Sequence, residues 1–355
     1  MAEALRLAEK GLYTATPNPR VGCVIVRDGE VVGTGWHEKT GGPHAEIVAL
    51  RAAGERARGA TAYVTLEPCS HHGRTPPCID ALIEAGITRL VAAMQDPNPK
   101  VAGSGFDRLR AAGIAVESGL MQDEAQALNV GFVSRMRRGR PWVRMKIAAS
   151  LDGRTALANG RSQWITGPEA RRDGHAWRAR ACAVLTGIGT VRDDDPQLNV
   201  REVQTPRQPL KVLVDSRLQL PLSAKLLEGG RVLVAAAVED KAGIAALQDR
   251  GAEVLLLPNA SGKVELTELM RELARRELNE VHVEAGFKLN GSLLSAGLVD
   301  ELLIYLAPSI LGHGARGMFD LPELEDLAQK RLVQFGQVQT IGSDLRVLAR
   351  VLNAI

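Results

Sequence analysis

The chain is poor in aromatic residues and cysteine and has no long apolar stretch. Aromatic side chains make up 3% of its 355 residues, so the base-stacking surfaces of single-stranded nucleic-acid binders are scarce. A formal net charge of +3 is nearly neutral for this length, which also disfavours nucleic-acid binding. No run of about 18 apolar residues suggests a membrane span, and residues 1–20 lack the apolar core of a signal peptide. We therefore expect no nucleic-acid or membrane partner, and four reduced cysteines fit a cytoplasmic location.

The pattern of apolar segments and turns predicts two α/β domains, residues 1–140 and 141–355. In the first domain, strands are expected at 21–26, 31–35, 62–66, 89–94 and 114–118, with helices from His44, from Pro76, around 106–112 and over 121–140. In the second, strands are expected at 142–150, 183–186, 211–215, 231–237, 253–257, 281–284 and 301–307, with helices at 264–277 and 292–296. Alternation of strand and helix is typical of layered α/β domains with parallel pairing. The basic run between Arg135 and Arg140 is interpreted as a solvated linker surface rather than a binding patch.

The most informative feature is a set of metal-binding residue types in the first domain. His44-Ala45-Glu46 is followed by the string Pro68-Cys69-Ser70-His71-His72-Gly73-Arg74-Thr75-Pro76-Pro77-Cys78. One imidazole and two thiolates leave a tetrahedral zinc ion with one open position for water, and zinc lowers the pKa of that water toward about 7. Glu46 is expected to pass the proton to a leaving amine rather than to bind the metal. The motif predicts a zinc-dependent hydrolytic deaminase that acts on an amino-substituted heterocycle.

The local sequence around these ligands is consistent with that chemistry. Pro76-Pro77 is expected to open a helix with Cys78 near its N-terminus, where the pKa of a thiol falls. Residues two apart do not share a helix face, so His44 and Glu46 must lie in an irregular first turn. The cysteines are further apart than in the usual Cys-x-x-Cys motif, and we expect the longer loop to contribute to substrate binding. Cys23 and Cys182 are expected to be buried fillers.

Two other classes of protein remain open. A nucleic-acid-editing deaminase would need a basic surface with aromatic side chains, which the composition disfavours. A non-catalytic scaffold stabilised by zinc normally has four protein ligands, and His71 could supply the fourth. Replacing Glu46 with Gln would separate the two uses of zinc, because activity would vanish while zinc stays bound.

The second domain has two glycine-bearing loops after predicted strands, but no complete Gly-x-Gly-x-x-Gly motif. One loop is Gly187-Ile188-Gly189-Thr190, and the other runs from Glu284 to Ser292. The second loop is expected to open a helix at Ser292, where backbone N–H groups could hold a phosphate. These residues by themselves indicate a ligand that contains phosphate, such as a nucleotide. The three aspartates at 193–195 are interpreted as a solvated helix start.

The chain resembles the bifunctional riboflavin-biosynthesis deaminase-reductases over nearly its whole length. Beside the zinc motif, the resemblance rests on Thr16–Pro19 with Val21-Gly22, Asp96–Pro99 with Val101 and Gly103–Gly105, Lys146–Arg154, Ser162–Thr166, Asp194–Pro196, Val214–Ser216 and Val283–Gly286. It implies an N-terminal cytidine-deaminase-like α/β/α layer and a C-terminal α/β domain similar to dihydrofolate reductase. It also implies two reactions: deamination of 2,5-diamino-6-ribosylamino-4(3H)-pyrimidinone 5′-phosphate, and then NADPH-dependent reduction of the ribosyl group to ribityl.

The same resemblance implies roles for particular residues. The zinc ligands would be His44, Cys69 and Cys78, with Glu46 catalytic. The substrate contacts would be Asn18, His71 and Arg74 in the deaminase, and Lys146, Ser162, Arg178, Leu198, Arg201 and Glu284 in the reductase, where Asp152 is also expected. The NADPH contacts would be Ala148, Trp164, Thr190, Asp194, Ser216, Gly286, Phe287, Lys288, Leu289, Asn290, Gly291 and Ser292.

Some of these roles have a physical rationale, and others stay open. Arg178 and Arg201 suit the substrate phosphate because guanidinium groups bind phosphate through paired, charge-assisted hydrogen bonds. Glu284 and Asp194 are candidates for the acid of the reduction. Many relatives have a histidine where this chain has Val48, a change that removes no metal ligand. The resemblance further implies a homo-oligomer, a dimer or a tetramer, formed mainly through the reductase domain.

Overall fold

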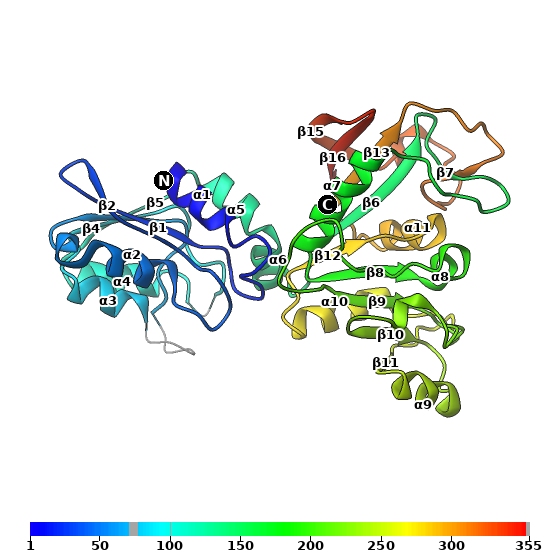
Figure 1. Cartoon of the computed structure of the whole chain (residues 1–355), viewed down its shortest axis with the longest axis horizontal. Coiled ribbons are helices and arrows are strands. Elements are labelled where there is room, and N and C mark those ends of the chain that lie inside the picture. The colour runs from blue at the N-terminus through cyan, green and yellow to red at the C-terminus, as the bar shows by residue number, and fades with distance from the viewer. Residues whose placement is uncertain (71–76, 100, 353–355) are drawn as a thin grey trace. The chain divides into compact units, whose positions relative to one another are not determined.

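The computed structural model of the chain describes residues 1–70, 77–99 and 101–352. They form two compact units, Met1–Arg140 and Pro141–Ile355, each built of a sheet with helices (Figure 1). The predicted fold class, two α/β domains, is confirmed. Among the helices of the described ranges, none combines the length and hydropathy that a membrane crossing requires.

The first unit contains a five-stranded sheet in the order β2-β1-β3-β4-β5. The pairs β1–β2 and β1–β3 are antiparallel, whereas β3–β4 and β4–β5 are parallel. The strands are β1 (Gly22–Arg27), β2 (Glu30–Trp36), β3 (Thr61–Val64), β4 (Arg89–Ala92) and β5 (Ala115–Ser118). The helices are α1 (Ala2–Glu9), α2 (Ala45–Ala53), the 3-10 turn η1 (Gly54–Ala57), α3 (Cys78–Glu84), α4 (Ser104–Ala111), α5 (Gln122–Leu128) and α6 (Val130–Arg138).

Small residues let α2 pack close to β2. A Cβ atom added at Gly35 would lie 2.3 Å from the carbonyl oxygen of Ala45, and one added at Gly33 would lie 2.3 Å from that of Ala49. Ala45 and Ala49 are both fully buried. Because no larger side chain fits between the helix and the strand, the start of α2 is held firmly against the sheet. This packing fixes the positions of His44 and Glu46.

The second unit contains a nine-stranded sheet in the order β11-β10-β9-β8-β12-β6-β13-β16-β15. Its strands are β6 (Trp142–Ser150), β8 (Ala183–Gly187), β9 (Leu210–Val214), β10 (Val232–Ala236), β11 (Ala252–Leu256), β12 (Glu280–Val283), β13 (Glu301–Ala307), β15 (Leu332–Ile341) and β16 (Asp344–Leu352), and a separate pair joins β7 (Arg154–Ala156) to β14 (Arg316–Gly317). The helical segments are α7 (Pro168–Arg180), α8 (Ile188–Asp194), η2 (Lys225–Leu227), α9 (Lys241–Asp249), α10 (Leu266–Arg275), α11 (Phe287–Ser295) and η3 (Leu327–Gln329).

The strand order brings the carboxyl ends of β6, β8 and β12 together. β12 lies between β8 and β6 and is parallel to both. In open α/β sheets, ligands bind outside the carboxyl ends of strands where the order of the chain reverses. Met145 and Val283 point to one face, where they share an apolar core with Leu269 of α10 and Leu293 of α11. That core holds the strand ends rigidly in place.

Several predicted elements match the structure, and some do not. The strands over Trp142–Ser150 and Glu301–Ala307 have the predicted limits. The helix predicted to open at Ser292 was placed wrongly, because α11 begins at Phe287 with Gly286 as its N-cap. The aspartates at 193–195 end α8 instead of starting a helix. Helix α7 and the β15–β16 hairpin were not predicted.

Candidate active sites

His44, Cys69 and Cys78 come together in the first unit. His44 precedes α2 with an extended backbone (φ −74°, ψ 161°), and Cys78 is the first residue of α3. The Nδ1 atom of His44 lies 3.0 Å from Cys78 Sγ and 3.5 Å from Cys69 Sγ. All three ligand atoms lie within 4.8 Å of one another. The expected irregular geometry is confirmed, since His44 lies outside the helix and Glu46 in its first turn.

This set of donor atoms fits a zinc ion. Tetrahedral zinc with bonds of about 2.0–2.3 Å holds its nitrogen and sulfur ligands roughly 3.5 Å apart. The hydrogen bond between the two thiols lowers the pKa of Cys69 to about 4 and raises the pKa of Cys78, so the lowered pKa expected for Cys78 at its helix start is wrong for the two thiols by themselves. The backbone N–H of Cys78 donates to Cys69 Sγ at 3.2 Å. Thiolate is the form that binds zinc. No fourth histidine, cysteine or carboxylate of the described residues joins the three, and His71 lies outside those residues.

Glu46 lies beside these ligands at the wall of a cavity of about 260 Å³. Its side chain is 3% exposed. Burial, followed by the negative charge of Cys69, raises the pKa of Glu46 to about 7. The cavity is lined by Asn18, Pro19, Val21, His37, Gly41, Gly42, His44, Glu46, Leu66, Glu67, Cys69, Asp96, Asn98, Phe132 and Met136. A buried carboxyl group with access to this cavity is placed for proton transfer to a molecule bound there.

The side chain of Asn18 is oriented by a histidine that the sequence did not indicate. The two side chains meet at 3.0 Å, between Asn18 Nδ2 and His37 Nε2. His37 Nδ1 lies 3.1 Å from the carbonyl oxygen of Pro43, to which it can only donate. In the neutral ring Nε2 is then an acceptor, so Asn18 donates through its amide nitrogen and its carbonyl oxygen is left for a ligand. Arg74, the other predicted contact beside His71, lies outside the described residues.

Glu67 is a further residue that the sequence analysis missed. It is 3% exposed and accepts hydrogen bonds from the backbone N–H groups of Asp96 at 3.0 Å, Gly103 at 3.0 Å and Gly105 at 2.9 Å. One carboxylate thus fixes the segment between β4 and α4 beside the cavity. The sequence did contain a signal for this role. Glu67 lies between an apolar strand and Pro68, and a glutamate buried at such a position needs hydrogen-bond partners.

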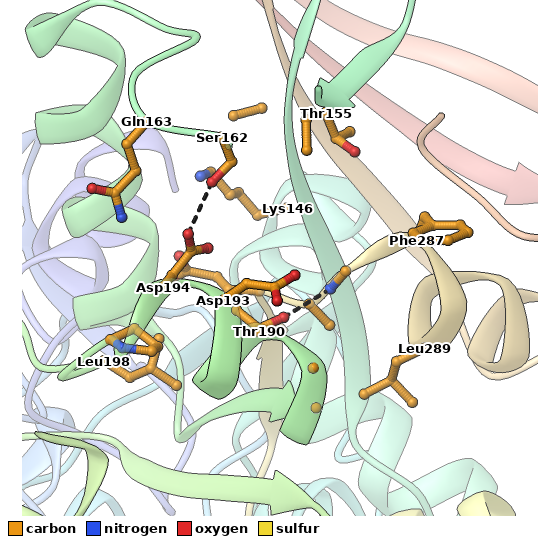
Figure 2. Close-up of a pocket in the computed structure, with 18 of the residues that line it drawn as sticks. Lys146, Thr155, Ser162, Gln163, Thr190, Asp193, Asp194, Leu198, Phe287 and Leu289 are labelled. Carbon is orange, nitrogen blue, oxygen red and sulfur yellow. Dashed lines mark hydrogen bonds between the residues drawn. The ribbon is translucent and has the colours of Figure 1, made fainter. Parts of the chain in front are cut away.

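The second unit contains a larger cavity, of about 1070 Å³, at the carboxyl ends of β6, β8 and β12 (Figure 2). Fifteen of the residues predicted to contact substrate or NADPH line it: Lys146, Ala148, Ser162, Trp164, Arg178, Thr190, Asp194, Leu198, Arg201, Glu284, Gly286, Phe287, Lys288, Leu289 and Asn290. Figure 2 shows Ser162 and Asp194 facing each other, with Ser162 Oγ donating to Asp194 Oδ1 at 2.9 Å. The cavity also includes residues that the sequence did not indicate, among them Arg171, Arg192 and Arg316.

A charged group of side chains lies at the inner end of this cavity. Arg178 of α7 forms an ion pair with Glu284, which follows β12. Burial opposes ionisation of Glu284, but the positive charges of Arg178 and Lys146 and a contact with His282 hold its pKa well below the usual range. Burial lowers the pKa of Lys146, which Glu284 partly offsets. At neutral pH, Glu284 is therefore an ionised acceptor.

The two glycine-bearing loops meet at the cavity wall. The backbone N–H of Gly286 donates to Thr190 Oγ1 at 3.0 Å, which ties α8 to the start of α11 (Figure 2). A Cβ atom added at Gly189 would meet nothing within 4 Å. Both loops follow the carboxyl ends of adjacent parallel strands, so their backbones border one open space.

Four of the predicted positions lie outside the lining of this cavity. Ser216 Oγ accepts a hydrogen bond from the backbone N–H of Val264 at 3.1 Å. Gly291 packs against Asp320, whose carbonyl oxygen would lie 2.0 Å from an added Cβ atom. Ser292 Oγ donates to the Lys288 carbonyl at 3.0 Å. Asp152, expected in the same pocket, instead accepts from the backbone N–H groups of residues 311 and 312. A part for Ser216, Gly291 and Ser292 in NADPH binding stays a prediction.

Val48 lies where α2 packs on β2. Its Cβ atom would be 2.8 Å from a Cβ atom added at Gly35, and it does not line the cavity that contains Glu46. The side chain at this position therefore contributes to packing between helix and strand. We expect the valine to leave the deaminase chemistry unchanged.

Comparisons with known proteins agree with this geometry. Residues 1–94 match the cytidine and deoxycytidylate deaminase zinc-binding region, and residues 141–347 match the RibD C-terminal domain. The riboflavin biosynthesis protein RibD of Escherichia coli K12 is 51% identical over 358 residues, which cover 97% of this chain and 96% of that protein. RibD of Haemophilus influenzae is 50% identical, over 98% of this chain and 95% of the relative.

Solved structures are similar over the same length. Acinetobacter baumannii RibD, form 1, has a TM-score of 0.91 at 45% identity and covers 99% of this chain and 98% of its own. A diaminohydroxyphosphoribosylaminopyrimidine deaminase/5-amino-6-(5-phosphoribosylamino)uracil reductase from Thermotoga maritima has a TM-score of 0.87 at 35% identity, with coverage of 99% and 97%. Fold and site together define an enzyme that joins a zinc-binding deaminase domain to a reductase domain. The chain belongs to the RibD family of bifunctional riboflavin-biosynthesis deaminase-reductases.

Proposed function

We propose that the first unit deaminates 2,5-diamino-6-ribosylamino-4(3H)-pyrimidinone 5′-phosphate by hydrolysis, and that the second unit then reduces the ribosyl group of the product to ribityl with NADPH. The observation that carries this proposal is the presence in one chain of two chemically different cavities. One has three zinc donors beside a buried glutamate, and the other has an arginine–glutamate pair beside two glycine-bearing strand ends. The name of the Thermotoga maritima relative joins the same two activities.

In the deaminase, His44, Cys69 and Cys78 would hold zinc, which when bound activates a water molecule. Glu46 takes a proton at its carboxylate oxygen and returns it to the departing amine, so that ammonia can leave. Burial excludes bulk water from this carboxyl group. Asn18 offers its carbonyl oxygen to an N–H group of the pyrimidine, since its amide nitrogen is engaged by His37.

In the reductase, NADPH would supply a hydride when bound. The backbone around Gly189 and Gly286 supports a nucleotide site because these loops leave room for a close approach. Arg178 and Arg201 line the same cavity and suit the substrate phosphate. Glu284 stabilises positive charge on the ribosylamine as an ionised acceptor, and Lys146, whose pKa is lowered, is the better proton donor. The lowered pKa of Glu284 argues against this residue, one of the two candidates from the sequence, as the acid of the reduction.

We also propose that two copies of the chain pair through β15. This strand is the edge of the nine-stranded sheet, and nine of its ten residues are exposed. It has no charged side chain and exposes Leu332, Phe335 and Val338 by 53%, 70% and 55%. Monomeric proteins usually protect such edges with charges or proline. A second copy related by a two-fold axis would bring the same strand alongside and cover both apolar surfaces.

Sedimentation equilibrium tests the dimer. We expect the wild type to form at least dimers and Phe335→Lys with Val338→Lys to shift it to monomers. Val31→Lys is the matched control, because Val31 is 57% exposed on β2 of the first unit. A wild type that stays monomeric at micromolar concentration would contradict the pairing.

A coupled assay tests the two reactions and their order. Purified protein of known zinc content is given the diaminopyrimidinone ribosyl phosphate, and ammonia release and NADPH oxidation are followed. We expect ammonia without NADPH, and NADPH oxidation only after deamination. Glu46→Gln should abolish ammonia release while zinc stays bound. Absence of both signals from a protein with one zinc per chain would reject the substrate and favour the scaffold alternative.

A further inference from the structure

One face of β12 presents a row of ionisable side chains to the interior. Glu280, His282 and Glu284 alternate along the chain with Val281 and Val283, which join the apolar core on the opposite face. Helix α7 contacts this strand and contributes Arg178 to Glu284 and Arg180 to Glu280. Such a row is unusual because buried charges are costly unless they are paired. Each carboxylate in it has an arginine partner.

His282 is the member of the row without such a partner. Its side chain is 0% exposed, and neither ring nitrogen makes an ordinary hydrogen bond to any described residue. The nearest acidic atom is Glu284 Oε1, 3.5 Å from His282 Nε2, at the outer limit of hydrogen-bond distance. A buried polar group without a partner is costly. A buried histidine without a partner, next to the cavity residue Glu284, therefore calls for a functional explanation.

The charges around His282 keep its ring neutral. β6 contributes Arg144, its register partner, α7 contributes Arg178, and β12 itself contributes Glu284. On the other side, β8 presents the uncharged Val184. Burial is the largest effect and lowers the pKa of His282. The neighbouring Glu284 raises this pKa, and the positive charges of Arg178 and Arg144 lower it further. A neutral ring has one N–H group, and Nε2 is the nitrogen that faces a carboxylate.

The guanidinium of Arg178 binds more than one partner. Its Nε and Nη2 atoms bind Glu284, and its Nη1 atom donates to the carbonyl oxygen of Asn199. In the proposed function, the same guanidinium also binds the substrate phosphate. Two of its five N–H groups remain for the phosphate, and a guanidinium that turns toward this second anion holds Glu284 less tightly, so the ionised carboxylate is better held with another donor.

We propose that His282 is a positioning residue of the reductase, which donates from Nε2 to Glu284 Oε1 and holds this carboxylate in place when Arg178 engages the substrate phosphate. The inference rests on the proposed roles of Arg178 and Glu284. A shift of well under 1 Å brings the 3.5 Å separation to the usual length of about 2.9 Å. His282 itself does not line the cavity, so it acts through Glu284.

Two substitutions at one position separate a hydrogen-bonding role from a packing role. His282→Leu fills the space without a donor, whereas His282→Gln places an amide N–H close to the position of Nε2. We expect His282→Leu to lower the reductase kcat by about 10-fold or more, as for the loss of a hydrogen bond to a charged group, with the KM for NADPH unchanged. His282→Gln should remain within about 3-fold of wild type on the same grounds. The unchanged KM for NADPH shows that the second unit is folded, and the deaminase activity of the first unit in the same preparations should not change.

A pH profile provides a readout that packing does not move. Without the His282 donor, Glu284 is protonated more easily, so the acidic limb of the reductase kcat should shift to higher pH in His282→Leu and not in His282→Gln. Glu284→Gln distinguishes a failure of the proposed function from a failure of the role proposed for His282. If Glu284→Gln retains the wild-type rate, the proposed function of Glu284 fails and this inference with it. If Glu284→Gln is inactive but His282→Leu keeps the wild-type rate and profile, or His282→Gln is as impaired as His282→Leu, only the inference is overturned.

Discussion

The guanidinium of Arg178 binds both carboxylate oxygens of Glu284, with Nε 2.7 Å from Oε1 and Nη2 2.9 Å from Oε2. The pair links α7 to the carboxyl end of β12, and both side chains are largely buried at the inner end of the larger cavity. Such a paired contact fixes orientation as well as charge. We therefore expect the function of the second unit to depend on the planar shape of the arginine and not on its charge alone.

Arg178→Lys tests this dependence. Lysine keeps the positive charge but cannot match two oxygens with one planar group. We expect the reductase kcat/KM to fall about 10- to 100-fold, the range for loss of a charge-assisted hydrogen bond. The deaminase activity of the same variant should be unchanged. Steady-state assays on the deaminated substrate measure the effect, and a variant with wild-type kcat/KM would show that charge alone is sufficient.

Removal of zinc should separate the two activities. His44, Cys69 and Cys78 all belong to the first unit, and the second unit has its own apolar core. We expect dialysis against a chelator to abolish ammonia release and added zinc to restore it. NADPH oxidation with already deaminated substrate should continue at the wild-type rate. Loss of both activities on chelation would mean that zinc also supports the reductase.

The sequence predicted the chemistry of the first site better than its surroundings. His44, Glu46, Cys69 and Cys78 have side chains whose combination has few other uses, so their meeting could be expected before the fold was known. His37 and Glu67 act through partners distant in sequence, such as Asn18 and Gly105. Only the packing of β2, α2 and the segment after β4 brings those partners together. Pairwise contacts of this kind leave little local pattern: the position of Glu67 after an apolar strand indicates that it needs partners, but not which ones.

In the second unit, strands were easier to predict than the helix over the cavity. β6 alternates Val143, Met145 and Ile147 with Arg144 and Lys146, the period of a strand, and β13 contains a short apolar run. Helix α7 is rich in arginine, and its buried residues are Ala170, Gly174, His175 and Ala179, so it has no stripe of large apolar side chains. The periodicity that indicates an amphipathic helix is therefore absent. The start of α11 was misplaced for a different reason: Gly286 caps that helix without any side-chain hydrogen bond, so no capping side chain marks its start in the sequence.

Gly291→Ala should destabilise the second unit. The new Cβ atom would lie 2.0 Å from the carbonyl oxygen of Asp320, so α11 or the backbone at 320 must move. We expect a loss of about 1–3 kcal/mol in the free energy of unfolding, typical of overpacking. Gly174→Ala is the matched control within a helix, since its Cβ atom would meet nothing within 4 Å. That control should be neutral or gain up to about 1 kcal/mol. Thermal unfolding compares the two, and equal melting temperatures would contradict the close packing.

Gly189→Val should weaken NADPH binding with little effect on stability. Gly189 lines the larger cavity, and the space beside it is open. A valine side chain would occupy the space that we assign to the cofactor. We expect the Kd for NADPH to rise about 10-fold or more, as for a steric clash of 1–3 kcal/mol. Quenching of protein fluorescence measures the Kd. An unchanged Kd would place the cofactor elsewhere in the cavity.

His175 should make the second unit less stable in weak acid. It is 5% exposed on α7, and burial, together with the positive charges of Arg178 and Arg201, lowers its pKa from 6.5 to about 4. Between these two values the unfolded chain binds a proton that the folded chain does not. The free energy of unfolding therefore falls as the pH drops through this window. At pH 5 the loss from this group is about 2 kcal/mol relative to pH 7.5.

His175→Asn isolates this contribution. Asparagine does not titrate, and its side-chain oxygen can replace His175 Nδ1 as the acceptor for the backbone N–H of Arg201, which lies at 3.5 Å. His37 and His282 also have lowered pKa values, but they affect wild type and variant alike. Urea unfolding at pH 7.5 and pH 5 should thus show a smaller loss of stability for the variant, by about 2 kcal/mol. Equal losses in both proteins would mean that His175 is protonated in the folded state, and that the surrounding arginines do not keep it neutral.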